Sequence, residues 1–171
     1  MDDELPPYAF FPGGPWPHPM RTAAGHSFDH KHRPPPPPID PADWQSSSEY
    51  LLGFRLWNAG YYWEAHETWE GLWHAHQRRG PIADLLKALI KLAAAGVKVR
   101  EGQPPGTVSH SSRAANLIAS IRSEIGPTLL GMDLISLQNM CERVALSPPG
   151  DSSVPGDRVH RVFDFEIHPH P

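Results

Sequence analysis

Apolar residues recur at three- and four-residue spacing through most of the chain between residues 40 and 146, which predicts α-helices. Glycine and proline pairs interrupt this pattern, so we expect five helices joined by short connections. Their approximate ranges are residues 40–58, 61–77, 81–100, 107–124 and 133–145. Short connections favour antiparallel neighbours, and the sequence therefore predicts an all-α domain, an orthogonal or antiparallel bundle of about five helices.

The N-terminal residues 1–39 follow a different pattern because prolines, five of them in a row at 34–38, exclude helix and favour extended chain. A disordered tail and an arm that packs on the domain both fit this composition. Aromatic residues such as Tyr8 and Trp16 argue for packing, since a purely solvated tail has few of them. We interpret residues 1–39 as a proline-rich extended arm and residues 40–146 as the helical domain.

The C-terminal residues 147–171 are expected to form a loop and a short extended segment. From Phe163 to Ile167, apolar and acidic residues alternate as they do in a strand. A single strand is unstable alone, and the apolar segment from Tyr8 to Phe11 is the other extended candidate. We therefore expect the two ends of the chain to pair, or at least to pack together.

The stretch from Trp57 to Gln77 holds four of the six tryptophans and three histidines. On a helical wheel, His66 lies about 40° and Glu70 about 80° from Tyr62, in or beside the apolar stripe, whereas Glu64 falls on the far side. A buried imidazole or carboxylate is costly unless it has a partner. We therefore expect His66 and Glu70 to face the interior and to mark the site of any chemistry.

Two neighbouring segments carry a family resemblance: YYWEAHETWEGLW at residues 61–73 and DLLKALIKLAAAGVKVREGQPPG at residues 84–106. Together they resemble the domain of unknown function 309 family, in which aromatics lead into a His-Glu pair, a second glutamate and a tryptophan. The matching residues here are His66, Glu67, Glu70 and Trp73, while Lys91 stands where the family has glutamine. The resemblance implies a small all-α bundle and implies no particular activity.

The order His-Glu-x-x-Glu is close to a zinc-peptidase motif, in which two histidines four residues apart bind the metal. Here His66 and Glu70 would be the metal ligands and Glu67 the general base, with a third ligand from His110 or from His26 in the arm. An imidazole with carboxylates suits zinc, iron or manganese. The reaction would then be metal-assisted hydrolysis or redox chemistry.

Two other interpretations need no metal. In a structural network, His66 would bond to a neighbouring helix and Glu70 would pair with a basic residue. In a ligand pocket, aromatic and basic side chains would bind a small anionic or aromatic molecule. The candidate basic partners of Glu70 are Arg55, Lys91 and Arg113; the whole polar cluster is His66, Glu67, Glu70, Trp73, Lys91, His110 and Arg113.

These patterns support a leading interpretation of a helical domain with a buried structural or ligand-binding cluster. A metal-dependent enzyme is the first alternative, and an adaptor that binds a protein partner through the proline-rich arm is the second. The sequence identifies no substrate, and it leaves open whether the chain is an enzyme and whether it forms a homo-oligomer.

Composition narrows the partners and the compartment. The net charge is −4 and no basic stripe stands out, so nucleic acid is not an expected partner. Lysines interrupt the longest apolar stretch, at residues 85–99, so no membrane span is expected. The single cysteine, Cys141, fits a reducing compartment, and we expect a cytoplasmic protein.

Overall fold

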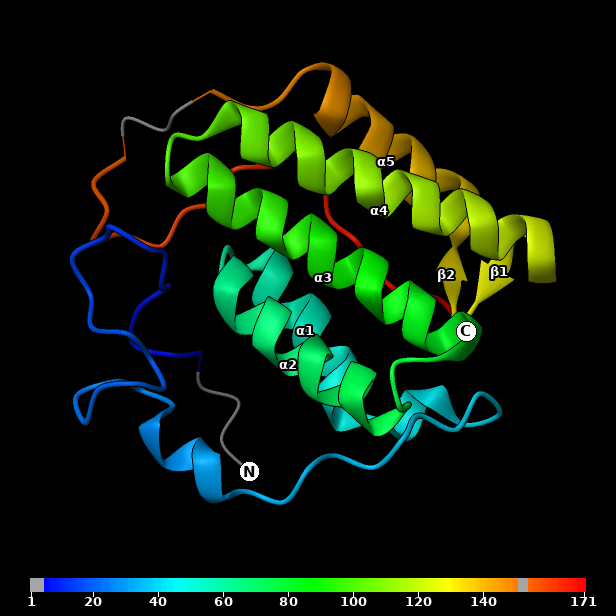
Figure 1. Ribbon diagram of the computed structural model, residues 1–171, viewed down its shortest axis with the longest axis horizontal. Helices are drawn as coiled ribbons and strands as arrows, with labels where there is room; N and C mark the ends of the chain where they lie inside the picture. Colours follow the sequence, from blue (N-terminus) through cyan, green and yellow to red (C-terminus); the bar gives the residue numbers. More distant parts are fainter. Residues whose placement is uncertain (1–4, 151–153) are drawn as a thin grey trace.

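The computed structural model describes residues 5–150 and 154–171 and contains the five expected helices (Figure 1). They are α1 (Ser48–Asn58), α2 (Tyr62–Ala75), α3 (Gly80–Arg100), α4 (Pro104–Ile125) and α5 (Leu134–Leu146). Two 3₁₀ helices, η1 (Phe28–His32) and η2 (Trp44–Ser46), precede them. A two-stranded antiparallel sheet of β1 (Thr128–Leu129) and β2 (Met132–Asp133) joins α4 to α5. The prediction of an all-α bundle is confirmed.

Helix α3 lies at the centre, with the α1–α2 pair on one side and α4 followed by α5 on the other (Figure 1). Its apolar residues surround most of its circumference, and twelve of its residues are buried. Another helix approaches closely at Gly96, where an added Cβ would lie 2.5 Å from the Tyr62 ring. The small residues of α3 therefore allow the aromatic face of α2 to pack directly against its backbone.

The first helix begins later than predicted. Asp40 does not cap a long helix; its Oδ1 accepts a hydrogen bond from the Ala42 amide at 2.9 Å, and α1 starts only at Ser48. The intervening Ser46 hydroxyl donates to the Asp43 carbonyl at 2.8 Å. Aspartate and serine side chains that bond to the local backbone compete with helix formation, which explains the short 3₁₀ turn in place of regular helix.

The C-terminal segment is extended, but the prediction of a strand is wrong. Phe163 and Ile167 are buried while Asp164 and Glu166 are exposed. The alternation of apolar and acidic residues therefore does correspond to a segment with one buried and one exposed face. The covering surface is helical: the Asn58 side chain of α1 accepts from the Ile167 amide at 3.0 Å and donates to its carbonyl at 2.8 Å. Phe163 also stacks on Trp57, with ring centroids 5.2 Å apart.

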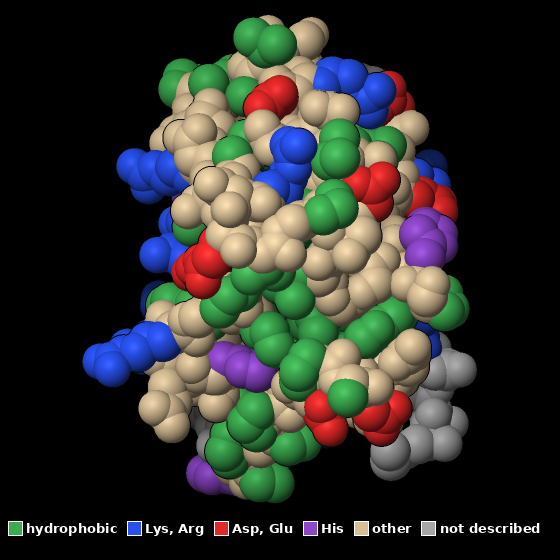
Figure 2. All heavy atoms as spheres, turned by 90° about the vertical axis from the view of Figure 1, so that its right-hand side faces the viewer, with side chains coloured by type: hydrophobic (Ala, Val, Ile, Leu, Met, Phe, Trp, Pro, Cys, Tyr) green, Lys and Arg blue, Asp and Glu red, His purple; other side chains and the backbone are tan. Residues whose placement is uncertain are grey.

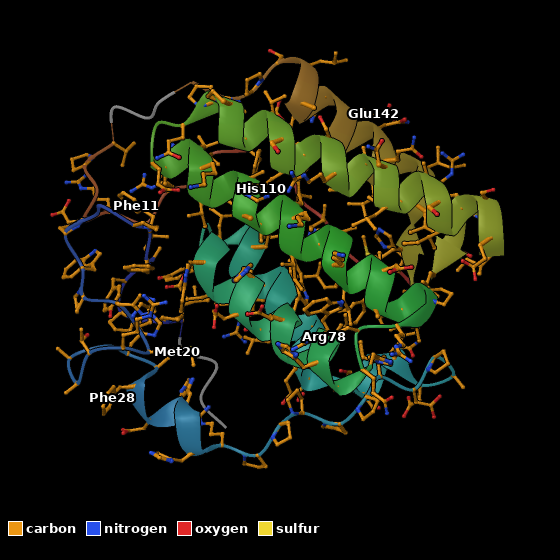
Figure 3. All side chains as sticks on the ribbon, in the orientation of Figure 1. Phe11, Met20, Phe28, Arg78, His110 and Glu142 are labelled. Atoms are coloured by element: carbon orange, nitrogen blue, oxygen red, sulfur yellow. The ribbon has the colours of Figure 1, made fainter. Side chains whose placement is uncertain are left out.

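The described part of the N-terminal arm packs on the helical domain. Phe11 and Met20 of the arm lie along one side of this domain (Figure 3). Tyr8 and Ile39 are buried, and Phe11 packs against the core. The two ends of the chain meet where a Cβ on Gly156 would lie 3.2 Å from the Phe11 ring. The alternative in which the ends pack together is therefore the one that the structure supports.

The surface is mixed in character. On the face that Figure 2 presents, acidic and basic side chains are interspersed among hydrophobic ones. None of the helices in residues 5–150 and 154–171 combines the length and the apolarity that a membrane crossing requires.

Candidate metal and ligand site

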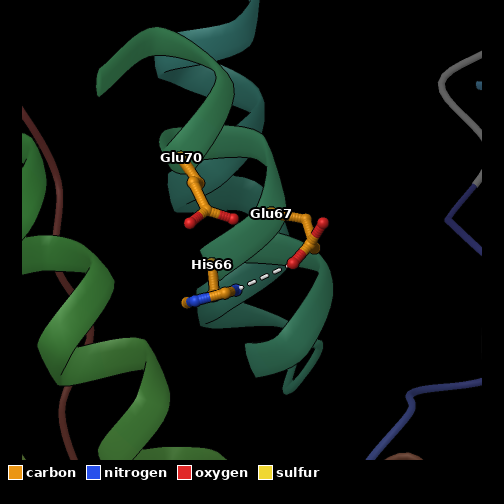
Figure 4. A group of neighbouring side chains, drawn as sticks. All are labelled: His66, Glu67 and Glu70. Atoms are coloured by element: carbon orange, nitrogen blue, oxygen red, sulfur yellow. Dashed lines mark ion pairs between the residues drawn. The ribbon is translucent and has the colours of Figure 1, made fainter. Parts of the chain in front are cut away.

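One continuous helix, α2, carries the three residues of the His-Glu-x-x-Glu motif (Figure 4). His66, Glu67 and Glu70 each offer one potential metal-ligand atom, and these atoms lie within 4.8 Å of one another. The distance from His66 Nδ1 to Glu67 Oε1 is 3.2 Å. The helical spacing predicted from the sequence thus places one imidazole and two carboxylates close together.

These three side chains are half-buried, so His66 and Glu70 are covered only in part and are not enclosed in the interior as the sequence predicted. The His66 side chain is 26% exposed and that of Glu67 is 29% exposed. The buried carboxylate of α2 is Glu64, at 5% exposure, which the helical wheel placed on the far side. A wheel gives only directions around one helix, and the arm covers the Glu64 side of α2.

The motif residues make few hydrogen bonds with neighbouring helices. His66 Nδ1 is buried without a hydrogen-bond partner among the described residues, because its contact with Glu67 lacks hydrogen-bond geometry. Within the described ranges, Glu70 forms no ion pair with Lys91 or Arg113. Of the partners expected for Glu70, Lys91 and Arg113 therefore give no support to the structural network, which stays a prediction.

The basic members of the predicted cluster come from α3 and α4 and share one electrostatic neighbourhood. Burial lowers the pKa of His110, and the charges of Lys91, Lys98, Arg113 and His66 lower it further. Burial also lowers the pKa of Lys91, and the positive charge of Arg113 lowers it further. His110 therefore lies near Lys91, Arg113 and His66, but it is not part of the group of ligand atoms formed by the motif.

Trp73 lies one turn further along α2 and takes a different role. Its ring contacts His74, with centroids 5.3 Å apart, and the Arg78 guanidinium lies 5.3 Å from its centroid. It is half-buried against the core. Trp73 therefore packs at the end of the helix and is separate from the three motif residues.

A second polar pair, which the sequence analysis did not assign, joins α2 to the arm. Glu64 Oε1 accepts a hydrogen bond from the Phe10 amide at 2.9 Å and lies 3.0 Å from His26 Nε2. The side chains of His26 and Glu64 are 7% and 5% exposed. His26 was a candidate third metal ligand, and in the structure it binds Glu64 instead. No local sequence pattern predicts this pair, because its two members are 38 residues apart.

A pocket of about 310 Å³ lies beside this pair, between the arm and helices α1 and α2. Apolar side chains form most of its wall, including Met20 from the arm, Leu52 and Leu56 from α1 and Trp63 from α2. Glu64 and Glu67 are its acidic residues. Glu67 belongs to both features, since it also contacts His66, and the pocket therefore adjoins the motif.

A family model described as Domain of unknown function (DUF309) matches residues 50–110. This segment of the chain is similar to the DUF309 family. The match spans α1, α2, α3 and the first turns of α4, and so includes the motif residues, Glu64, Lys91 and His110. The resemblance seen in the sequence is confirmed over this range. No curated protein matches the chain. DUF309 denotes an uncharacterised domain, and the role of its His/Glu cluster must be argued from the chemistry of the side chains.

Proposed function

We propose that this helical domain binds a divalent metal ion through His66, Glu67 and Glu70. The observation that carries the proposal is the convergence of three ligand atoms within 4.8 Å on one helix. Two carboxylates and one imidazole at this separation form a donor set that suits zinc, iron or manganese. Two carboxylates held close together repel each other, and a cation between them removes that repulsion.

Partial exposure of the three side chains also supports the proposal. A purely structural cluster would be expected to satisfy its buried polar atoms within the protein. Here His66 Nδ1 has no hydrogen-bond partner among the described residues. With three protein ligands and access to solvent, a bound metal would keep a coordination position for water or for a substrate, as catalytic metal sites do.

A metal-dependent enzyme is the extension of this proposal. In that case His66 and Glu70 are ligands, and Glu67 is either the third ligand or the general base. Lys91 and Arg113 would supply positive charge for an anionic group of the substrate, and His110, whose pKa is lowered, would add a neutral imidazole. Their shared electrostatic neighbourhood, which includes His66, is the observation that favours this arrangement.

Metal binding is tested with untagged protein that has been stripped with a chelator and titrated with zinc, manganese or iron(II). We expect about one equivalent per chain by calorimetry and elemental analysis. His66→Ala and Glu70→Gln should abolish this binding. The matched control is His74→Ala, because His74 lies on the same helix and is exposed, and its side chain accepts a hydrogen bond only from Arg78 among the described residues.

Two results would contradict the proposal. The first is the absence of metal binding tighter than about 1 mM by the folded wild-type protein. The second is equal stoichiometry and affinity in the wild type and in His66→Ala, which would place the metal on other histidines.

A further inference from the structure

The pocket between the arm and helices α1 and α2 contains a buried carboxylate oxygen without a partner. Glu64 lines the pocket, and its Oε2 is buried without a hydrogen-bond partner among the described residues. The side chain is 5% exposed. A buried, unpaired carboxylate oxygen is costly, and such atoms in folded proteins usually have a partner.

The partners of the other Glu64 oxygen, Oε1, both come from the arm. The Phe10 amide donates to Oε1 at 2.9 Å, and His26 Nε2 lies 3.0 Å from the same atom. His26 Nδ1 lies 2.8 Å from the Ser27 hydroxyl. A neutral imidazole that donates from Nε2 and accepts from Ser27 at Nδ1 satisfies both contacts.

The rest of the pocket selects a ligand with an apolar body. Met20, Leu52, Leu56 and Trp63 contribute apolar wall, while Glu67 adds a second carboxylate. His30, also in the wall, adds little positive charge, because burial and then the charge of Arg33 lower its pKa. A volume of about 310 Å³ is at the small end of ligand-binding cavities.

We propose that this pocket binds a small organic amine, whose ammonium group reaches Glu64 and whose apolar body lies against Trp63 and the leucines of α1. An ammonium group donates up to three hydrogen bonds and carries the charge that two acidic wall residues favour. The occupant is an organic cation and not a metal, because the candidate metal ligands in the described chain are grouped at His66, Glu67 and Glu70. The proposal does not depend on metal binding by that group.

The probes are hexylamine and benzylamine, with hexanol, benzyl alcohol and hexanoate as neutral and anionic counterparts. Binding to the full chain is measured by calorimetry and by NMR shifts of the Trp63 indole and the Thr68 amide, both of which belong to pocket residues. A chelator is present throughout, so that failure of the metal proposal and failure of this one are separate results. We expect saturable binding of the amines and at least about tenfold weaker binding of the alcohols and of hexanoate.

Two variants locate the site. Glu64→Gln keeps the size of the side chain and an acceptor for Phe10 while removing the charge, and should weaken amine binding at least about tenfold. Leu52→Trp places an indole at the pocket wall and should block binding without disturbing the core, since Leu52 is 38% exposed. The matched control is Leu51→Trp: Leu51 is also 38% exposed, but it lines a different cavity, and the affinity should be unchanged.

The proposal is overturned if hexylamine shows no saturable binding below about 10 mM, or if hexanol binds equally well. It is also overturned if Leu52→Trp binds amines like the wild type. This second variant keeps the test decisive even if Glu64→Gln fails to fold.

Discussion

At the scale of single residues, two glutamates of α2 have different environments although they are only three positions apart. Glu64 is covered by the arm and bonded to it, whereas Glu67 is half-exposed and contacts His66. Burial and existing partners, and not residue type, therefore separate the carboxylate that holds the arm from the carboxylate that is available to a metal ion. Each of the two carboxylates can be tested by a single substitution.

Replacing Glu67 by glutamine tests whether it is a metal ligand. We expect Glu67→Gln to weaken metal affinity at least about tenfold, since a neutral amide is a poorer ligand for a divalent cation than a carboxylate. Calorimetric titration of the stripped protein measures the change. Unchanged affinity would remove Glu67 from the ligand set and leave it the role of general base.

Replacing Glu64 by alanine tests its role in holding the arm. The substitution leaves the Phe10 amide and His26 without their acceptor and opens a cavity, so we expect a loss of about 1–3 kcal/mol in the free energy of unfolding. Urea denaturation measures it. The control, Glu142→Ala on the exposed face of α5, should change stability by less than about 0.5 kcal/mol. Equal effects of the two substitutions would contradict the assigned role.

At the scale of elements, the contact of α1 with α2 depends on one glycine. A Cβ added to Gly53 would lie 2.1 Å from Trp69 Nε1, and this indole donates to the Tyr50 carbonyl at 3.3 Å. The Trp69 indole of α2 therefore packs directly against the backbone of α1. The absence of a side chain at residue 53 determines how closely the two helices approach, and with it the position of the motif.

Two glycine-to-alanine substitutions separate packing from helix propensity. Gly53→Ala should destabilise the protein by about 1–3 kcal/mol through overpacking, although alanine favours helix by about 1 kcal/mol. Gly71→Ala on α2 should be neutral or stabilising, because its Cβ would meet only Pro36 at 3.5 Å. Thermal and urea unfolding of both variants provide the comparison. A Gly53→Ala protein as stable as Gly71→Ala would show that the helices can move apart at little cost.

At the scale of the whole molecule, the two ends of the chain complete the fold. The arm closes the pocket over α1 and α2 and ends at Ile39, which is buried. The Ile39 amide donates to His76 Nε2 at 2.9 Å, a bond that requires a neutral imidazole. The adaptor interpretation of the arm stays a prediction, and the proline run that would serve it, residues 34–38, is largely exposed.

The His76 contact predicts a pH dependence. Burial lowers the pKa of His76 below its usual value of 6.5, so the unfolded chain takes up this proton at a higher pH than the folded protein does. Its contribution to stability is therefore complete above about pH 6.5 and is lost as the pH falls through the lowered pKa. His76→Gln keeps an acceptor for Ile39 but does not titrate, and stability measured between pH 7.5 and 5 should fall less steeply in this variant. Identical slopes would show that His76 does not contribute.

The sequence by itself determined the helices, because the period of its apolar residues and its glycine and proline pairs are local properties. It also placed His66 and Glu70 on the same side of α2. Only the tertiary structure decided which carboxylate is buried. The arm residues that cover Glu64 are 38 and 54 positions away from it, and helical periodicity contains no information about contacts over such distances.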